Sequence, residues 1–200
     1  MTETSLRDAK RAATARALSW AAFELATEGG VDSFTIDEVV ARAGYSRRTF
    51  ANHYSCKEEA IAAVLPEAVR EGVDTVPDVP EDAPLVEWLS AVARHQLGGP
   101  MLELMRQVQE LSTAHPSLNP WFLEAQRTIR QIAIDAATER AGARFPALYV
   151  HLLAGALYGA LSAAFDGPFT LRLPGEPRRA DSLDVDRLLE TTFAHLRTGF

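Results

Sequence analysis

A short polar and basic stretch holds the side chains of this chain that are best suited to chemistry. Residues 44–57 read GYSRRTFANHYSCK, in which Arg47 and Arg48 stand beside Thr49 and no acid comes before Glu58. Guanidinium groups can bond a guanine edge twice, asparagine can do the same with adenine, and threonine can contact a polar edge or a thymine methyl group. Such a set of side chains can read bases or bind phosphate.

The charge of the whole chain limits how broadly such a stretch can act. The 200-residue chain has a formal net charge of −7, and residues 1–60 hold 8 basic and 9 acidic side chains. An acidic body disfavours unspecific coating of nucleic acid, whereas a local basic patch can still meet phosphate. The basic residues of the first part cluster at Lys10, Arg11, Arg47, Arg48 and Lys57.

Helical periodicity recurs from end to end and predicts an all-α fold. A first helix is expected over residues 7–28. Pro66 lies inside a later helical pattern and should kink or split that helix, and the proline-rich stretch 74–84 reads as a connection between two parts. Further helices are expected over residues 85–97, 101–114, 118–141, 145–166 and 183–198, with a long polar loop over 167–182.

Two short helices that meet at Gly44–Tyr45 form a candidate helix–turn–helix. Thr35 and Ser46 are the expected N-caps of these helices, and Ser55 with Glu58 matches a capping box for the helix that follows. A solvated face on any helical protein would show similar residue types. The residues expected to meet bases or phosphates are Thr35, Ser46, Arg47, Arg48, Thr49, Asn52, His53 and Lys57.

The wider pattern of residues 15–61 resembles the DNA-binding domain of TetR-type transcriptional repressors. The shared features are a long first helix, EGG and a following aromatic residue, Thr35 opening the second helix, ARAGYS, a threonine and an aromatic residue in the recognition helix, HYSCKEE and an apolar fourth helix. The resemblance implies a three-helix DNA-binding domain over residues 1–60 and a helical ligand-binding and dimerisation domain over 61–200. It also implies that the eight residues above, Ser46 apart, occupy positions that commonly touch DNA.

Two positions depart from the family's pattern. Arg48 stands where many members have glycine, and Ala51 stands where many have an aromatic residue. Arg48 adds a charge that can reach a base, whereas Ala51 lacks the ring that often lies on the DNA backbone or a thymine methyl group. The operator therefore cannot be copied from better-known members.

The resemblance implies a function: a ligand-responsive, sequence-specific transcriptional repressor, not an enzyme, released from a palindromic operator by a small apolar or amphipathic effector. The segment ELSTAHPSLNPWFLEAQRTI resembles a subgroup associated with acyl-coenzyme-A-like ligands. An apolar pocket with a few polar anchors would suit such effectors, although the same residues also suit plain core. The candidate lining is Trp88, Met101, Leu104, Met105, Trp121, Phe122, His151, Tyr158 and Phe165, and the candidate anchors are His95, Arg106, Gln107, Arg130 and His151.

Residues 145–165 contain no charged side chain and are long enough to consider as a membrane span. Their many small residues make them only mildly apolar, so a helix buried on several sides is the simpler interpretation. The resemblance implies a homodimer through helices near 145–166 and 183–198. Its two recognition helices would read a palindrome about one DNA turn apart.

Catalytic, metal and redox chemistry have weak support in the sequence. No histidine spacing suits a metal and no nucleophile elbow or phosphate-binding glycine loop occurs, so neither metal nor cofactor is expected. An all-helical enzyme or adaptor stays open as an alternative. Cys56 stands alone, which fits a reducing compartment; beside Lys57 at a helix start its pKa could be lowered, so a redox switch stays open. The first residues lack a secretory signal, which favours the cytoplasm.

Overall fold

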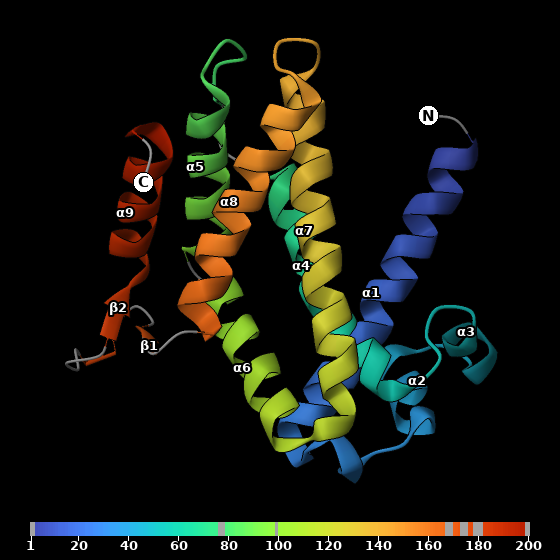
Figure 1. Ribbon diagram of the computed structural model, residues 1–200. Helices are drawn as coiled ribbons and strands as arrows, with labels where there is room; N and C mark the ends of the chain where they lie inside the picture. Colours follow the sequence, from blue (N-terminus) through green and yellow to red (C-terminus); the bar gives the residue numbers. More distant parts are fainter. Residues whose placement is uncertain are drawn as a thin grey trace. The chain divides into compact units, whose positions relative to one another are not determined.

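The computed structural model describes residues 3–75, 79–98, 100–166, 170–172, 176–177 and 182–198. Helices dominate this part of the chain (Figure 1), which confirms the all-α prediction. They are α1 (Glu3–Gly29), α2 (Ile36–Ala43), α3 (Arg47–Ala51), α4 (Lys57–Asp74), α5 (Leu85–Leu97), α6 (Pro100–Ala114), α7 (Asn119–Ala141), α8 (Ala147–Asp166) and α9 (Val185–Thr198). Single 3-10 turns lie at η1 (Val31–Ser33) and η2 (Pro116–Leu118).

Two short strands replace part of the polar loop expected over residues 167–182. Strand β1 (Thr170–Arg172) pairs in parallel with β2 (Ser182–Asp184). Arg172 Nε donates to Asp184 Oδ1 over 2.6 Å, and Arg172 Nη1 donates to the Glu176 carbonyl over 2.8 Å. The prediction of a loop without strands is therefore wrong at these residues, while 167–169, 173–175 and 178–181 lie outside the described part.

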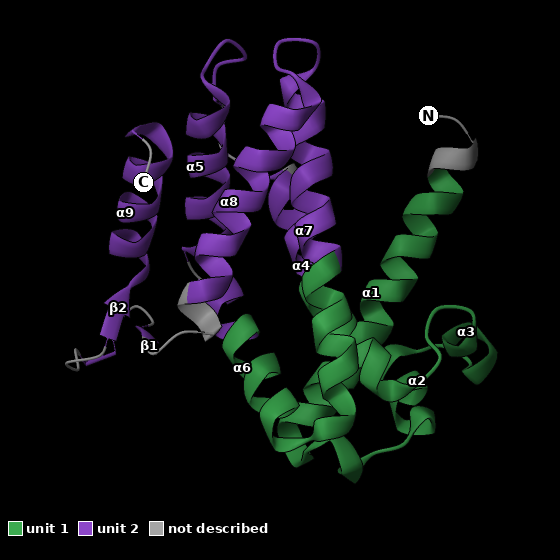
Figure 2. Ribbon diagram, viewed as in Figure 1, with its two compact units in different colours: residues 1–67, 105–127 green, residues 68–104, 128–200 purple. Residues whose placement is uncertain are grey.

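The chain divides into two compact units (Figure 2). Unit 1 comprises residues 1–67 and 105–127, and unit 2 comprises residues 68–104 and 128–200. Helices α4, α6 and α7 each contribute residues to both units. The expected functional boundary after residue 60 stays a prediction, because compact units and functional domains need not coincide.

Large apolar side chains from successive elements form the core of unit 1. Leu18 of α1, Val39 of α2, Phe50 of α3 and Ile61 of α4 are all at most 2% exposed. Full burial of one such side chain contributes about 1.5–3 kcal/mol. The short helices α2 and α3 are therefore held mainly by the side chains that they bury, because helices of this length are unstable alone.

Helix α2 begins and ends as the sequence predicts. Thr35 and Glu38 form a capping box, in which the Thr35 backbone N–H donates to Glu38 Oε2 over 2.8 Å and the Glu38 N–H donates to Thr35 Oγ1. Gly44 takes the left-handed conformation, with φ of 74°, which glycine adopts without a Cβ penalty. These two signals set the length of α2 and the direction in which the chain turns toward α3.

The start of α4 differs from the expected capping box. Ser55 donates from its backbone N–H and its hydroxyl to Glu59 Oε2, over 2.6 Å each, and not to Glu58. Cys56 Sγ accepts the Glu59 N–H over 3.4 Å. Because the helix begins at Lys57, Glu59 occupies the third position, where a carboxylate can reach back to the preceding residues.

Pro66 does not split α4. The helix runs without interruption over Lys57–Asp74, with Pro66 buried inside it. Proline has no N–H, so the helical bond to the carbonyl four residues earlier is missing at this point. Of the two expected outcomes, a kink or a split, the split is therefore wrong and the kink stays a prediction.

Unit 2 is built from α5, α8 and α9 with parts of the longer helices. Leu89 of α5 and Leu189 and Phe193 of α9 are buried. Arg197 on α9 makes two hydrogen bonds to Glu87 on α5, of 2.8 and 2.9 Å. Among the helices that the structure describes, α8 included, none has the length and hydropathy that crossing a membrane requires.

Candidate nucleic-acid interface

Helix α3 packs against the rest of unit 1 through Phe50 and carries exposed basic side chains. Phe50 is 2% exposed, and the Tyr54 ring after the helix lies 5.8 Å from it, centroid to centroid. Tyr54 also donates from its hydroxyl to the Ala15 carbonyl of α1 over 3.0 Å. Arg47 and Arg48 are both exposed. Phe50 and Tyr54 therefore anchor the segment while both guanidinium groups reach solvent.

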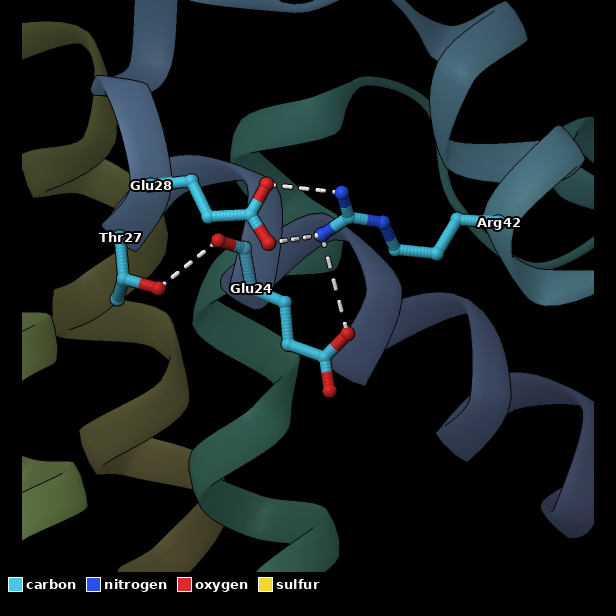
Figure 3. A network of polar contacts seen from close by, with 4 residues as sticks. All are labelled: Glu24, Thr27, Glu28 and Arg42. Carbon is cyan, nitrogen blue, oxygen red and sulfur yellow. Dashed lines mark hydrogen bonds and ion pairs between the residues drawn. The ribbon is translucent and has the colours of Figure 1, made fainter.

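An arginine on α2 fixes that helix against α1 (Figure 3). Arg42 donates from both terminal nitrogens to the two carboxylate oxygens of Glu28, over 2.6 and 2.8 Å, and lies 3.9 Å from Glu24. These hydrogen bonds lower the pKa of Glu28 and raise that of Arg42. The charge of Arg42 is thus paired within the chain. This pairing orients α2 for the turn into α3.

The two arginines of α3 differ in their surroundings. Arg47 Nη1 lies 3.3 Å from Asp37 Oδ2 of α2, and both side chains are about two-thirds exposed, at 69% and 67%. The Arg48 carbonyl accepts the Asn52 N–H, but the Arg48 side chain has no hydrogen bond or ion pair within the described residues. The Arg48 guanidinium can therefore bind an external acceptor directly. Arg47 must first give up its contact with Asp37.

The polar residues around α3 are partly used by the helix itself. Ser46 Oγ accepts the Thr49 N–H over 3.1 Å, which confirms the expected cap. The two hydroxyls, Ser46 Oγ and Thr49 Oγ1, lie 2.8 Å apart. Asn52 is the C-cap, and its exposed side chain lies one turn after Arg48. A base or phosphate can reach Asn52 directly, while Ser46 and Thr49 keep spare acceptor capacity.

His53 lies at the end of this segment in a half-buried position. Burial, and secondly the positive charge of Arg11, lower its pKa from the ordinary 6.5. The imidazole is therefore mainly neutral at pH 7. A phosphate beside it would favour the protonated form.

Lys57 has internal partners that the sequence did not reveal. Its Nζ donates to the Phe34 carbonyl over 2.9 Å and lies 4.9 Å from the centroid of the Phe34 ring. An ammonium group has three donors, so this contact leaves two for other acceptors. Thr35 next to it is exposed, and its hydroxyl serves the capping box, in which the Thr35 N–H lowers the pKa of Glu38.

Tyr45 is a further exposed side chain beside the predicted DNA-contacting residues. It occupies the turn between α2 and α3, is 38% exposed, and its hydroxyl lies 3.5 Å from Thr14 Oγ1 of α1.

Cys56 does not have the environment of a reactive thiol. Burial is the largest effect on its pKa and raises it, although the Glu59 N–H acts in the opposite sense. A raised pKa reduces the fraction of the nucleophilic thiolate. The possible lowering of this pKa therefore has no support, because burial outweighs the hydrogen bond from the Glu59 N–H.

The residues expected to line an effector pocket belong to both units. Met105, Trp121 and Phe122 are half-buried in unit 1. In unit 2, Leu104 is buried, and Trp88, Met101 and Tyr158 are half-buried. His151 is exposed, and its Nδ1 lies 2.9 Å from the Ala147 carbonyl. The side chain of Phe165 lies outside the described part. A common pocket stays a prediction.

The expected polar anchors are equally dispersed. His95 is exposed, with its Nε2 2.9 Å from the Thr75 hydroxyl. Arg106 and Gln107 are half-buried, and Arg130 is exposed. Within the residues that can be described, no group of three or more histidine, cysteine, aspartate or glutamate side chains is placed to hold a metal ion.

Comparison with known proteins gives one matching family model and several similar structures, two of which are described here. The family model for bacterial regulatory proteins of the tetR family matches residues 20–64. A TetR transcriptional regulator from Rhodococcus sp. RHA1 has 23% identity, with 94% of this chain and 96% of that chain covered and a TM-score of 0.49. A transcriptional regulator from the same source has 19% identity, 92% and 94% coverage and a TM-score of 0.49. A search among curated proteins finds no match.

The matched segment contains the whole candidate interface. It includes α2, α3, the first part of α4, and all eight residues expected to contact DNA, from Thr35 to Lys57. Members of this family are DNA-binding regulators and not enzymes. Residues 20–64 of the chain therefore form a helix–turn–helix DNA-binding domain of the tetR family of bacterial regulatory proteins.

Proposed function

We propose that the chain is a repressor that binds a palindromic operator and leaves it when a small effector binds. The observation that carries this proposal is the exposed face of α3. Arg47, Arg48 and Asn52 are all exposed, on or directly after a helix that the buried Phe50 anchors. Arginine and asparagine are the side chains that bond guanine and adenine edges in the major groove. Thr35, Ser46, Thr49, His53 and Lys57 would supply the surrounding phosphate or base contacts.

A homodimer through α8 and α9 would provide the two reading heads. Leu148 and Leu152 on α8 are 71% and 63% exposed, which is unusual for large apolar side chains so close together. Further along the same helix, a Cβ added to Gly155 or Gly159 would meet nothing within 4 Å. This open, apolar face with small residues suits close approach by the same helix of a second copy.

Release by an effector would follow from linkage between two binding equilibria. An effector that prefers a shape with the wrong separation of reading heads must weaken operator binding by its differential affinity. We place the pivot near Pro66, because the division between the two units crosses α4 between residues 67 and 68. Pro66→Ala should reduce the effector response; an unchanged response would remove Pro66 from the mechanism.

The effector is proposed to be small and apolar or amphipathic, with acyl-coenzyme-A-like molecules as the narrower candidate. The support is the set of apolar and aromatic side chains expected around the pocket, of which Leu104 is buried and Met101, Met105 and Tyr158 are half-buried. A DNA-bound repressor of this kind would work in the cytoplasm. Titration of the protein–operator complex with acyl-coenzyme A, and with free coenzyme A as control, tests the narrower candidate.

Variants that each remove one expected base contact test the proposal. Arg48→Ala should reduce discrimination between the selected operator and a variant at a single base pair by about 1–3 kcal/mol. Arg127→Ala removes an equal charge from an exposed position of α7 and should leave discrimination unchanged. Equal discrimination by wild-type protein and Arg48→Ala would remove α3 as the reading element at that base.

A further inference from the structure

The first turns of α1 present a basic face that none of the roles above uses. Residues 6–13 are all exposed, and in Figure 1 these turns extend beyond α2 and α3. Arg7, Lys10 and Arg11 stand at helical spacing i, i+3 and i+4. At about 100° per residue they share an arc of about 100°, with Asp8 outside it. Arg7, Lys10 and Arg11 form the α1 basic face.

This face leads directly to the segment that holds α3. Thr14 lies one turn after Lys10, donates to the Lys10 carbonyl over 2.9 Å, and has its hydroxyl 3.5 Å from that of Tyr45. The next residue, Ala15, accepts the Tyr54 hydroxyl at its carbonyl over 3.0 Å. Tyr45 precedes α3 and Tyr54 follows it. The two tyrosines therefore hold α1 against both ends of the reading helix.

The charges of the α1 basic face act on the same surface. The positive charge of Arg11 contributes to lowering the pKa of His53, after burial, while Glu67 acts in the opposite sense. The structure describes no ion pair for Arg7, Lys10 or Arg11. A solvated helix face would also be exposed, but it would not need to be basic and continuous with a reading helix. Phosphates are the ligands that such charges favour beside a DNA-reading element.

We infer that the α1 basic face binds backbone phosphates of the DNA that flanks the segment read by α3. The inference rests on the proposed DNA-reading role of α3 and extends the contacted DNA beyond the bases that α3 reaches. Because phosphate contacts carry no sequence information, this face should add affinity equally to all sequences. Its effect should depend strongly on salt and on the presence of flanking base pairs.

The test compares full-length wild-type protein with R7Q/K10Q/R11Q, in which glutamine preserves helix propensity. Each phosphate contact contributes about 0.9 to the slope of log affinity against log salt concentration, so the slope should fall by two to three for the triple variant if every charge binds. Wild-type protein should bind a duplex with flanks more tightly than one trimmed to the selected motif. The triple variant should bind both equally well.

A single pair of variants controls for net charge. Arg11→Gln should lower the slope, whereas Arg127→Gln, with the same charge change on α7, should not. Thermal unfolding shows whether each variant is folded. An unchanged slope and an unchanged flank dependence in a folded triple variant would overturn the inference, as would equal effects of the two single changes.

The failure of this inference can be told apart from failure of the proposed function. If wild-type protein selects no motif, the salt dependence of its binding to random duplex DNA still tests the inference. A smaller slope of log affinity against log salt concentration for R7Q/K10Q/R11Q supports the inference, and an unchanged slope overturns it. Vesicles with anionic lipid test the competing partner. Loss of vesicle binding in the triple variant, with DNA binding unchanged, would assign the α1 basic face to membranes and overturn the DNA assignment.

Discussion

The Arg47 guanidinium lies 3.3 Å from the Asp37 carboxylate, so the first residue of α3 is held by the first turn of α2. Both side chains are exposed, and exposed ion pairs contribute only about 0.2–1 kcal/mol. DNA can therefore replace Asp37 at little energetic cost. Until then the carboxylate limits the directions in which Arg47 can point, and its negative charge opposes the approach of phosphate.

Asp37→Asn should have two opposite effects on DNA binding. Removing a negative charge should tighten binding to every duplex at low salt. Arg47 would lose its orienting partner, so discrimination at the base that Arg47 reads should fall by about 0.2–1 kcal/mol, less than the 1–3 kcal/mol expected for Arg47→Ala. Competition binding against single-base operator variants measures both quantities. A double-mutant cycle is the control: with Arg47→Ala already present, Asp37→Asn should no longer change discrimination, and a persisting change would contradict the orienting role.

Lys57→Ala should affect both stability and DNA binding. The loss of the hydrogen bond to the Phe34 carbonyl and of the ring contact should lower the free energy of unfolding by about 1–2 kcal/mol. A lost phosphate contact should also lower the salt slope by about 0.9 for all sequences. Denaturant unfolding and salt titration measure the two effects. Lys57→Arg, which keeps the charge, should retain the slope; if the alanine variant also retains it, Lys57 is a purely structural residue.

Operator affinity should rise as the pH falls below 6.5. The pKa of His53 lies below its ordinary 6.5 in the unbound protein, so His53 is neutral at pH 7 and takes up a proton only at lower pH. A bound phosphate raises that pKa, and binding therefore becomes stronger as protons become available. The fold itself should lose stability in the same direction, because the unfolded chain binds the proton more readily. Operator titrations between about pH 5.5 and 7.5 should show a weaker dependence for His53→Gln. The same dependence in both proteins would exclude His53 as the source.

Leu152→Glu should convert a homodimer into a monomer. The side chain is 63% exposed on α8, next to Leu148 and in line with the open face at Gly155. A charge placed there cannot be buried against a second copy without a large desolvation penalty. Sedimentation should give twice the 21.8 kDa chain mass for wild type and the single mass for the variant. Leu123→Glu, at another exposed leucine on α7, should remain dimeric. A dimer in both variants would remove α8 from the interface.

Local signals in the sequence were sufficient where an element depends on its own residues. Thr35 and Glu38 stand three residues apart, and Gly44 is the one residue type that ends a helix with a positive φ at no cost, so both ends of α2 could be predicted. The predicted partner of Ser55 at the start of α4 was wrong because two neighbouring acids could fill that role. Glu58 and Glu59 are equally suited chemically, and only the helix start at Lys57 decides between them.

Features that join distant residues could not be predicted. Lys57 and Phe34 are 23 positions apart, and no pattern in either segment indicates that the amine and the carbonyl meet. Strands β1 and β2 have three residues each, too few to show an alternation of apolar and polar positions. Burial of Cys56 depends on packing as well, which is why its neighbour Lys57 suggested the opposite shift in pKa.

Selection of binding sites from random duplex DNA by purified protein, at near-physiological salt, tests whether the protein reads DNA as a dimer. A dimeric reader with Arg47, Arg48 and Asn52 exposed on α3 predicts a palindromic motif whose half-sites lie about one helical turn apart. Arg48→Ala should then select a motif that is degenerate at one position in each half-site. Recovery of no motif, with only salt-sensitive binding to all sequences, would contradict the account.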